Sequence, residues 1–419
     1  MDERLPGTES TGRERTICHV DMDCFYAACE RLKEPALEGE PLVVGMGFEA
    51  GESHGAVATA SYEAREYGVE SAMAISEALE LSPRHDAAAD DPDIDPEDAG
   101  YYRPVDMEFY ESVAADVREI LHDTADTVRE VSIDEAYLDV TDAVAWDDVE
   151  SFASDLKSRI SEEVGVDASV GVAPAMSAAK IASDHDKPDG LVVVEPGEVR
   201  SFLAPLDVAE VHNVGPVTAR ELRSMGIETA GDLAEADPDR VTETFGERGR
   251  EIWRYARGED DRDVEPVGKP KSLSRESAFT EATDDRKRKR DRVRALAGDV
   301  ADRAERKGAL YQTIGIKVVT PPFDVHTRAD SLPGPIEDAD LVEEIALDLL
   351  AEFDDDEVRK VGVRVSNLDF ADSDQASLDG FEDANTRENQ SLTDFTDRRR
   401  SERDPDDGTA GQTSLADFE

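Results

Sequence analysis

Apolar residues recur along most of the chain at the two spacings that regular secondary structure requires. Short runs rich in β-favouring residues predict strands, and apolar residues repeated every three or four positions predict helices. Residues 56–60 are expected to lead into a helix, and the Pro- and Asp-rich stretch 82–100 to be a solvated loop. The expected strands include 17–22, 41–45, 131–133, 168–172, 313–319 and 360–365, and the expected helices 113–121, 149–163, 176–184 and 283–307.

The order of these elements favours a particular fold class. Over the first half of the chain it is strand, helix, strand, strand, helix, strand, which is the split βαβ or ferredoxin-like pattern. Residues 201–258 are helical, and strands alternate again with amphipathic helices over 272–370. Because 419 residues exceed one ordinary domain, the sequence predicts an α+β protein of several domains.

Two short acidic segments carry the candidate chemistry, His19–Ala27 and Ser132–Asp139. Asp21, Asp134 and Glu135 lie at or just past apolar strands, where unpaired charges would be costly. Carboxylates of this kind suit Mg²⁺, and three of them could hold two metals about 3.5–4 Å apart, as phosphoryl transfer requires. The alternative is that each segment is an ordinary turn or a solvated strand end.

The geometry of a strand limits how the second acidic segment can work. Neighbouring residues of a strand point to opposite faces. Asp134 and Glu135 can therefore reach one metal site only from a strand end or a hairpin turn. The apolar run that follows, 137–140, is consistent with a hairpin.

The net charge changes how the rest of the chain is interpreted. The chain has 100 acidic and 46 basic residues and a net charge of −54, which normally argues against nucleic-acid binding. The acidic residues are spread over the whole chain, a pattern typical of a cytosol with molar salt, where the Debye length is roughly 3 Å. We therefore expect a halophilic protein in which local basic clusters say more than the total charge.

The cysteines and the hydropathy of the chain indicate its cellular compartment. The three cysteines, Cys18, Cys24 and Cys29, form no disulfide framework and no zinc spacing. No signal peptide and no apolar run of about 18 residues is present. We expect a cytoplasmic protein without a membrane segment.

Three local features point to nucleic acid. Residues 211–222 read as a helix, a tight Asn/Gly turn and a helix, either an ordinary joint or a phosphate site at a helix N-terminus. Seven of the nine residues 286–294 are basic. Charged runs are usually solvent-exposed helix faces, but this basic run occurs in a strongly acidic chain. Further cations accompany later strands. The candidate DNA-binding residues are Arg286, Lys287, Arg288, Lys317, Arg328 and Arg364.

In combination these motifs are specific: over residues 16–370 the chain resembles the Y-family translesion DNA polymerases, most closely the archaeal form of the DNA polymerase IV branch. Several long motifs occur in the right order, so coincidence is a poor explanation. They are Val20–Tyr26 (VDMDCFY), Gly55–Arg65 (GAVATASYEAR), Ser132–Asp139 (SIDEAYLD), Val170–Val172, Ala179–Asp184 and Lys187–Gly190 (KPDG).

The resemblance implies a right-hand polymerase with a ferredoxin-like palm. The implied parts are a disordered N-terminus (1–15), a palm (16–24 and 91–190), small fingers (25–90), a helical thumb with a helix-hairpin-helix-like motif (191–259), a linker (260–271), an α/β little finger (272–370) and a disordered tail (371–419).

The resemblance also assigns roles at the site. Asp21, Asp134 and Glu135 would be the catalytic carboxylates that bind two Mg²⁺, with the Met22 carbonyl as a further ligand. Tyr26 would be the steric gate against a 2′-hydroxyl. The other implied nucleotide-binding residues are Cys24, Phe25, Tyr62, Arg65 and Lys187, whereas Asp23 is interpreted as a structural carboxylate and Lys180 receives no firm role.

The implied activity is template-directed, error-prone DNA synthesis past damage, without proofreading. Primer-template DNA and deoxynucleoside triphosphates are the expected partners of a monomer. A sliding clamp is expected to bind the C-terminal tail through Gln412, Leu415 and Phe418.

The chain departs from the family pattern in three places. Ala175 and Met176 stand where relatives often have Asn-Lys, and Asn213 stands where a Gly is usual in the thumb turn. Asn tolerates the left-handed conformation, so we expect the turn to survive. Glu419 replaces a second aromatic residue of the clamp motif, which would weaken clamp binding.

Two other functions are alternatives to polymerisation. One is a different two-metal enzyme on a ferredoxin-like palm, such as a nucleotide cyclase, which the thumb-like hairpin, basic helix and clamp-like tail oppose. The other is a non-catalytic DNA-binding scaffold, which the full set of carboxylates and phosphate-binding residues opposes.

Overall fold

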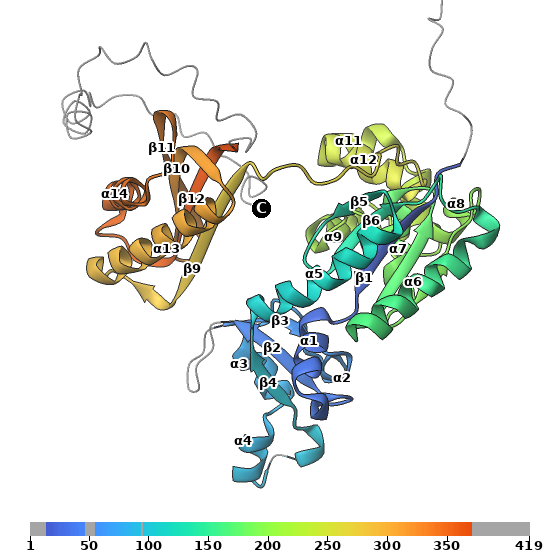
Figure 1. Cartoon of the computed structure of the whole chain (residues 1–419), viewed down its shortest axis with the longest axis horizontal. Coiled ribbons are helices and arrows are strands. Elements are labelled where there is room, and N and C mark those ends of the chain that lie inside the picture. Colours follow the sequence, from blue (N-terminus) through green and yellow to red (C-terminus); the bar gives the residue numbers. More distant parts are fainter. Residues whose placement is uncertain (1–13, 47–54, 94, 371–419) are drawn as a thin grey trace, which may run out of the picture.

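The computed structural model describes residues 14–46, 55–93 and 95–370. The expected clamp-binding residues Gln412, Leu415 and Phe418 lie outside this range. Three sheets organise the described chain: a five-stranded one, a three-stranded one and a four-stranded one (Figure 1). Within the described residues no helix is both long and apolar enough to cross a bilayer.

The five-stranded sheet has the expected ferredoxin-like topology. Its strand order is β5-β6-β1-β7-β8, and β1 pairs antiparallel with both β6 and β7. Helix α5 lies between β1 and the β5–β6 hairpin in the chain order, and α6 connects that hairpin to β7. The prediction of an α+β fold is therefore confirmed. The bounds are β1 Ile17–Met22, β5 Thr127–Glu130, β6 Glu135–Asp139, β7 Ala168–Ala173, β8 Leu191–Val193, α5 Met107–Thr124, η3 Trp146–Asp148 and α6 Val149–Val164.

Strand alternation gives this sheet two buried faces. Cys18, Val20 and Met22 face the core built by α5 and α6, whereas Ile17 lies in a second core with α7 (Met176–His185). The close approach of α7 requires glycine in β7: a Cβ at Gly171 would lie 2.1 Å from the Ala179 carbonyl oxygen. The odd-numbered face of β1 is thus directed toward α7.

A smaller sheet, ordered β3-β2-β4, lies in the part of the chain that the resemblance assigns to the fingers. Residues 56–60 form a strand of this sheet and lead into the helix Tyr62–Glu66, as expected, whereas the stretch 82–100 contains a short helix and is not wholly loop. Because β4 pairs with β2, the expected palm boundary at residue 91 is wrong: the chain stays with this sheet through Pro104. The bounds are α1 Phe25–Lys33, η1 Pro35–Leu37, β2 Leu42–Met46, β3 Ala56–Ala60, α2 Tyr62–Glu66, α3 Ile75–Leu81, α4 His85–Asp90, η2 Pro96–Asp98 and β4 Tyr101–Pro104.

Short helices follow β8 and share a core with α7. The expected thumb boundary at 191 is wrong because β8 is still a strand of the five-stranded sheet. In the hairpin, Asn213 adopts the left-handed conformation (φ 69°), as we expected, but the first expected helix is only a 3-10 turn. The bounds are α8 Val199–Leu203, η4 Val208–Glu210, α9 Pro216–Ser224, α10 Ala230–Glu235, α11 Pro238–Phe245 and α12 Glu247–Ala256.

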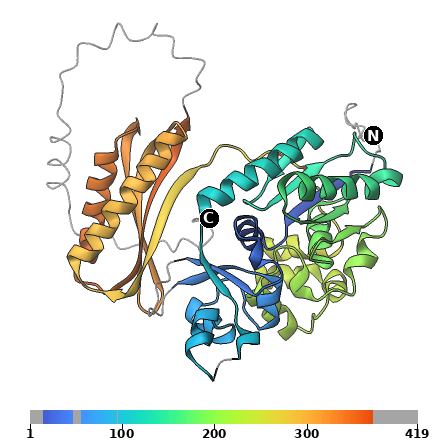
Figure 2. The same ribbon diagram turned by 60° about the horizontal axis from the view of Figure 1, so that its bottom comes forward.

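The C-terminal body is a four-stranded antiparallel sheet, ordered β11-β10-β12-β9, with two helices on one side (Figure 2). Alternate residues of the strands, such as Ile316 and Val363, pack against α13 and α14 in one core. No helix of the described residues covers the opposite face, which we call the helix-free face. The bounds are β9 Ser272–Thr283, α13 Arg286–Arg306, β10 Ala309–Thr320, β11 Asp324–Ile336, α14 Ala339–Leu350, η5 Ala351–Phe353 and β12 Val358–Phe370.

An extended segment joins this body to the rest of the chain (Figure 1). The expected linker, 260–271, is wrong in its first residues, because Asp260 and Val264 are 4% and 5% exposed. The expected disordered N-terminus, 1–15, is wrong at Arg15, whose guanidinium donates to the carbonyls of Asp260 and Arg262 at 2.5 and 2.7 Å. Residues 1–13 lie outside the described chain.

Lys289 stands apart from its neighbours in the basic run. Its side chain is fully buried, and its ammonium donates to the carbonyl oxygens of Phe353, Asp354 and Asp356 at 2.8–2.9 Å. Burial lowers the pKa of Lys289. These bonds satisfy carbonyls at the end of η5, so Lys289 is a structural residue of the C-terminal body.

We expect Lys289→Ala to lower the free energy of unfolding by about 2–4 kcal/mol, because three buried acceptors lose a charged donor. Lys287→Ala, on the exposed side of the same helix, is the control and should leave stability nearly unchanged. Denaturant unfolding in molar KCl measures both, and equal effects would contradict the structural role.

Candidate active site

The two acidic segments meet across a pair of strands. Asp21 near the end of β1 is the register partner of Glu135 at the start of β6. Directly opposed residues of antiparallel strands project to the same face, so both carboxylates face α7. Residues 131–133, which we expected to form a strand, make the turn between β5 and β6 instead. The turn brings Asp134 beside this pair.

Asp134 is held within the turn by its neighbours. The Ser132 hydroxyl donates to its carboxylate, and the Met22 amide donates to its backbone carbonyl at 2.9 Å. Burial raises the pKa of Asp134, and the charges of Asp21 and Glu135 raise it further. A third group nearer to Asp21 and Glu135 is His19: ligand atoms of these three residues lie within 4.8 Å of one another.

Two lysines neutralise the facing carboxylates. Lys180 of α7 contacts Asp21 at 2.8 Å and Glu135 at 2.9 Å, and Lys187 contacts the other oxygen of Asp21 at 2.6 Å. Both lysines also pair with Asp184, at 3.4 and 3.0 Å. Burial alone would raise the pKa of Asp21, but the two ammonium groups outweigh it and hold that pKa below its usual value.

His19 connects the sheet to α7. Its Nδ1 lies 2.8 Å from the Ser183 hydroxyl, and its Nε2 lies 3.4 Å from Glu135. The ring is fully buried with its edge toward Tyr137. Burial lowers the pKa of His19, and His19 and Lys180 together lower the pKa of Glu135 to about 2 against the effect of burial.

Asp23 has the structural role that the sequence suggested. Its carboxylate accepts hydrogen bonds from the Ser169 hydroxyl (3.0 Å), the Asp189 amide (2.8 Å) and the Tyr62 hydroxyl (3.1 Å). These donors come from β7, the loop after Lys187 and α2. Asp23 therefore ties three separate segments together beside the carboxylate pair.

Tyr62 and Arg65 share one side of α2. The Arg65 guanidinium lies over the Tyr62 ring at 4.8 Å and donates to the Ala60 carbonyl at 3.1 Å. Because Tyr62 and Asp189 both bond to Asp23, α2 lies next to the loop that carries Lys187. The structure thus brings Tyr62, Arg65 and Lys187 to one neighbourhood.

The residues after β1 differ in accessibility. Tyr26 is half-buried and stacks on Tyr110 at 4.7 Å. Cys24 adopts a left-handed conformation and its thiol donates to the Ala60 carbonyl at 3.4 Å. Phe25 is 2% exposed and packs in the core, so its predicted part in nucleotide binding falls to its backbone.

The candidate DNA-binding residues do not lie on one surface. Lys317 and Arg364 project from the helix-free face of the C-terminal sheet, because their neighbours Ile316 and Val363 face the core. Arg328 pairs with Ile316 in register, lies over Phe353 on the helix-covered face and is paired with Glu352. Strand alternation separates these cations between the two faces of the sheet.

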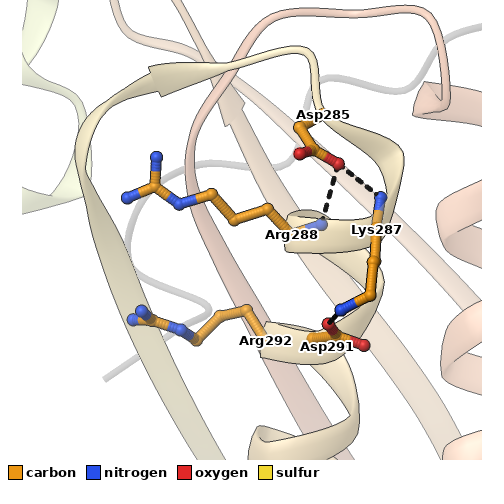
Figure 3. Close-up of a pocket in the computed structure, with 5 residues that line it drawn as sticks. All are labelled: Asp285, Lys287, Arg288, Asp291 and Arg292. Carbon is orange, nitrogen blue, oxygen red and sulfur yellow. Dashed lines mark hydrogen bonds and ion pairs between the residues drawn. The ribbon is translucent and has the colours of Figure 1, made fainter.

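The start of α13 forms a third basic location. Lys287, Arg288 and Arg292 line a hollow of about 400 Å³ with Asp285 and Asp291 (Figure 3). Asp285 caps the helix through the amides of Lys287 and Arg288, and Lys287 pairs with Asp291 at 2.5 Å. Arg286 pairs with Asp355 at 2.5 Å. Much of the charge in the run is therefore compensated locally.

Three family models match this chain. The impB/mucB/samB family matches residues 20–184, its C-terminal domain matches 270–379, and its HHH motif matches 196–227. A DNA polymerase IV from Halobacterium salinarum is 64% identical over 90% of this chain and 91% of its own length. One from Methanoculleus marisnigri is 40% identical over 88% and 99%. The chain belongs to the Y family of DNA polymerases.

Solved structures agree with this assignment. A Y-family polymerase chimera, Dbh-Dpo4(243-245)-Dbh, matches with a TM-score of 0.74 at 29% identity, over 85% of this chain and 99% of its own. An insertion ternary complex of Dbh DNA polymerase matches with a TM-score of 0.60 at 28% identity, with the same coverage. The chain is a DNA-directed DNA polymerase of the translesion type.

Y-family membership implies use of a divalent metal ion, and the donor set fits one. Asp21 and Glu135 offer hard carboxylate oxygens within one small cluster, the ligands that Mg²⁺ prefers. Lys180 and Lys187 contact these oxygens, so the cluster stabilises positive charge.

Sequence reasoning missed part of the site. His19 was not singled out, although it lies two residues before Asp21 and therefore on the same strand face. The sequence assigns no firm role to Lys180 and offers Asp184 only as the last residue of a motif. Their helix spacing of four was readable from the sequence, but the direction of α7 toward β1 was not.

We expect Asp23→Ala to lower the free energy of unfolding by about 2–4 kcal/mol, because three donors lose a charged acceptor. Asp147→Ala, an exposed acid at η3, is the matched control. Thermal and denaturant unfolding in molar KCl give the comparison. If Asp23→Ala were as stable as the control, the tie between β7, α2 and the Lys187 loop would not matter to folding.

Proposed function

We propose that Asp21, Asp134 and Glu135 hold two Mg²⁺ and that the chain uses them to add deoxynucleotides to the 3′ end of a primer paired to a template. The observation that carries this proposal is the register pairing of Asp21 with Glu135, which directs both carboxylates to one point beside the turn of Asp134. Once bound, the metals would activate the primer hydroxyl and stabilise the departing pyrophosphate. The Met22 carbonyl is proposed as a further ligand.

The triphosphate is proposed to bind between α2 and the Lys187 loop. A hydroxyl, a guanidinium and an ammonium suit phosphate oxygens, and Tyr62, Arg65 and Lys187 meet around Asp23. Lys187 already contacts Asp21 at 2.6 Å, so a phosphate held there would lie next to the metal carboxylates. Cys24 would contribute to triphosphate binding through its backbone, which leads into α1.

A further partner is proposed to bind through residues that lie outside the described chain. Gln412, Leu415 and Phe418 are proposed to bind a sliding clamp, and the protein is proposed to act as a cytoplasmic monomer. The proposed structural parts follow the sheets: the five-stranded palm, the three-stranded fingers, the helical thumb after β8 and the C-terminal little finger.

Primer extension in molar KCl with Mg²⁺, on undamaged and abasic templates, tests the central proposal. We expect Asp134→Ala to lower kcat by roughly 10³-fold or more, because several kcal/mol of metal-dependent stabilisation are lost. Asp126→Ala, an exposed acid just before β5, should remain active. Absence of extension by the folded wild type, or equal extension by both variants, would refute the assignment of the site.

Tyr26 is proposed to exclude ribonucleotides through its ring, which is backed by Tyr110. We expect Tyr26→Ala to raise the relative kcat/KM for a ribonucleotide at least about tenfold, since a steric clash worth more than about 1.4 kcal/mol is removed. Tyr26→Phe keeps the ring and should keep the selectivity. Single-nucleotide insertion assays compare them, and unchanged selectivity in Tyr26→Ala would rule out the gate.

The helix-free face of the C-terminal sheet is proposed to follow the DNA backbone. Glu276 on this face pairs with Lys317 at 3.0 Å and with Lys360. Burial would raise the pKa of Glu276, but the two lysines outweigh it and lower that pKa. Glu276 therefore stays ionised and occupies two cations that could otherwise contact phosphates.

We expect Glu276→Gln to strengthen DNA binding and to steepen the plot of log affinity against log salt by about 1 or 2. Glu352→Gln removes the same charge on the opposite face, beside Arg328, and should change neither quantity. Fluorescence anisotropy with a labelled duplex across a KCl series distinguishes the two. Equal effects of both variants would indicate a response to net charge alone.

A further inference from the structure

The helix that carries Lys180 lacks a cap of its own. Its N-cap residue is Ala175, whose methyl group cannot accept a hydrogen bond, and no acidic residue lies in its first turn. The first amides of a helix have no partner within the helix. An uncapped first turn frays more readily, and a missing cap typically costs about 1 kcal/mol.

A residue far along the chain supplies the missing acceptor. The carboxylate of Asp260 accepts the Ser177 amide at 2.9 Å, in the position where a local cap would act. Asp260 is only 4% exposed. A negative charge at this end of α7 is also favoured by the helix dipole.

Asp260 is itself fixed on several sides. The Arg262 guanidinium donates to both of its carboxylate oxygens, at 2.8 and 2.9 Å, and Arg15 donates to its backbone carbonyl. Burial alone would raise the pKa of Asp260, but Arg262 and the Ser177 amide lower it to about 2. The carboxylate is thus a permanent acceptor at the root of the segment that leads to the C-terminal body.

The capped turn adjoins the metal carboxylates. Lys180 follows Ser177 by three residues, so the two share one side of α7. The Lys180 ammonium lies between Asp21 and Glu135, at 2.8 and 2.9 Å. Displacement of the first turn of α7 would move Lys180 away from at least one of these carboxylates.

We propose that Asp260 is a positioning residue for the active site: it caps α7 from the root of the interdomain segment and so fixes Lys180 against Asp21 and Glu135. This role rests on the proposed function of that site. It also means that the segment joining the C-terminal body is held against the core around α7 as far as Val264.

The test compares Asp260→Ala with Asp261→Ala, since Asp261 is a neighbouring but exposed acid that pairs with Arg254. We expect Asp260→Ala to lower kcat roughly three- to tenfold while KM for the nucleotide changes less than about twofold. Amide exchange should accelerate at residues 177–180. Asp261→Ala should change neither measurement.

A second substitution separates capping from a general loss of stability. Ala175→Ser introduces a hydroxyl at the N-cap, and in the Asp260→Ala background it should restore both kcat and slow exchange. Asp260→Asn keeps an acceptor oxygen and should retain most of the activity; Asp260→Ser replaces Asp260→Ala if the latter does not fold. Unchanged kcat in Asp260→Ala, or a loss that Ala175→Ser does not restore, would overturn the proposal.

The exchange measurement does not depend on catalysis. If the folded wild type failed to extend a primer, the proposed function would fail, while unchanged exchange at residues 177–180 in Asp260→Ala would refute the cap by itself. The two failures are therefore distinguishable.

Discussion

The contact of Lys180 with Asp21 and Glu135 is the interaction on which the rest of the site depends. Register pairing of β1 with β6 forces two carboxylates to face each other, and like charges at this distance destabilise the sheet unless a cation lies between them. Lys180 reaches both because Gly171 lets α7 lie directly on β7. Strand register, helix approach and charge balance are thus parts of one arrangement.

Helix α7 packs both on the five-stranded sheet and on the helices that follow β8. The side chains on the side of α7 away from Lys180 belong to the same core as the thumb helices and Val264. A helix in this position transmits a displacement of the thumb to the carboxylates, since packed interiors deform little. The root of the interdomain segment is attached to this helix through the hydrogen bond from the Ser177 amide to Asp260.

The acidic residues pair with individual basic residues in addition to setting the net charge of the chain. With a net charge of −54, many basic residues already have acidic partners, such as Arg328 with Glu352 and Lys317 with Glu276. Exposed pairs contribute little to stability, and salt screens them. On the face proposed to contact DNA, such an acid would set how many cations remain for phosphate.

The sequence by itself determined the family, the ferredoxin-like order of elements and the carboxylates that could hold a divalent metal, because motif residues and strand alternation are local properties. It also indicated that Asp134 and Glu135 need a hairpin turn. Only the tertiary structure decided that Phe25 is buried, that β4 and β8 belong to sheets across the expected boundaries, and that Arg328 and Arg364 lie on opposite faces. It alone joined Asp260 to α7. These facts depend on which distant segments pack together, and no local pattern of residues fixes that.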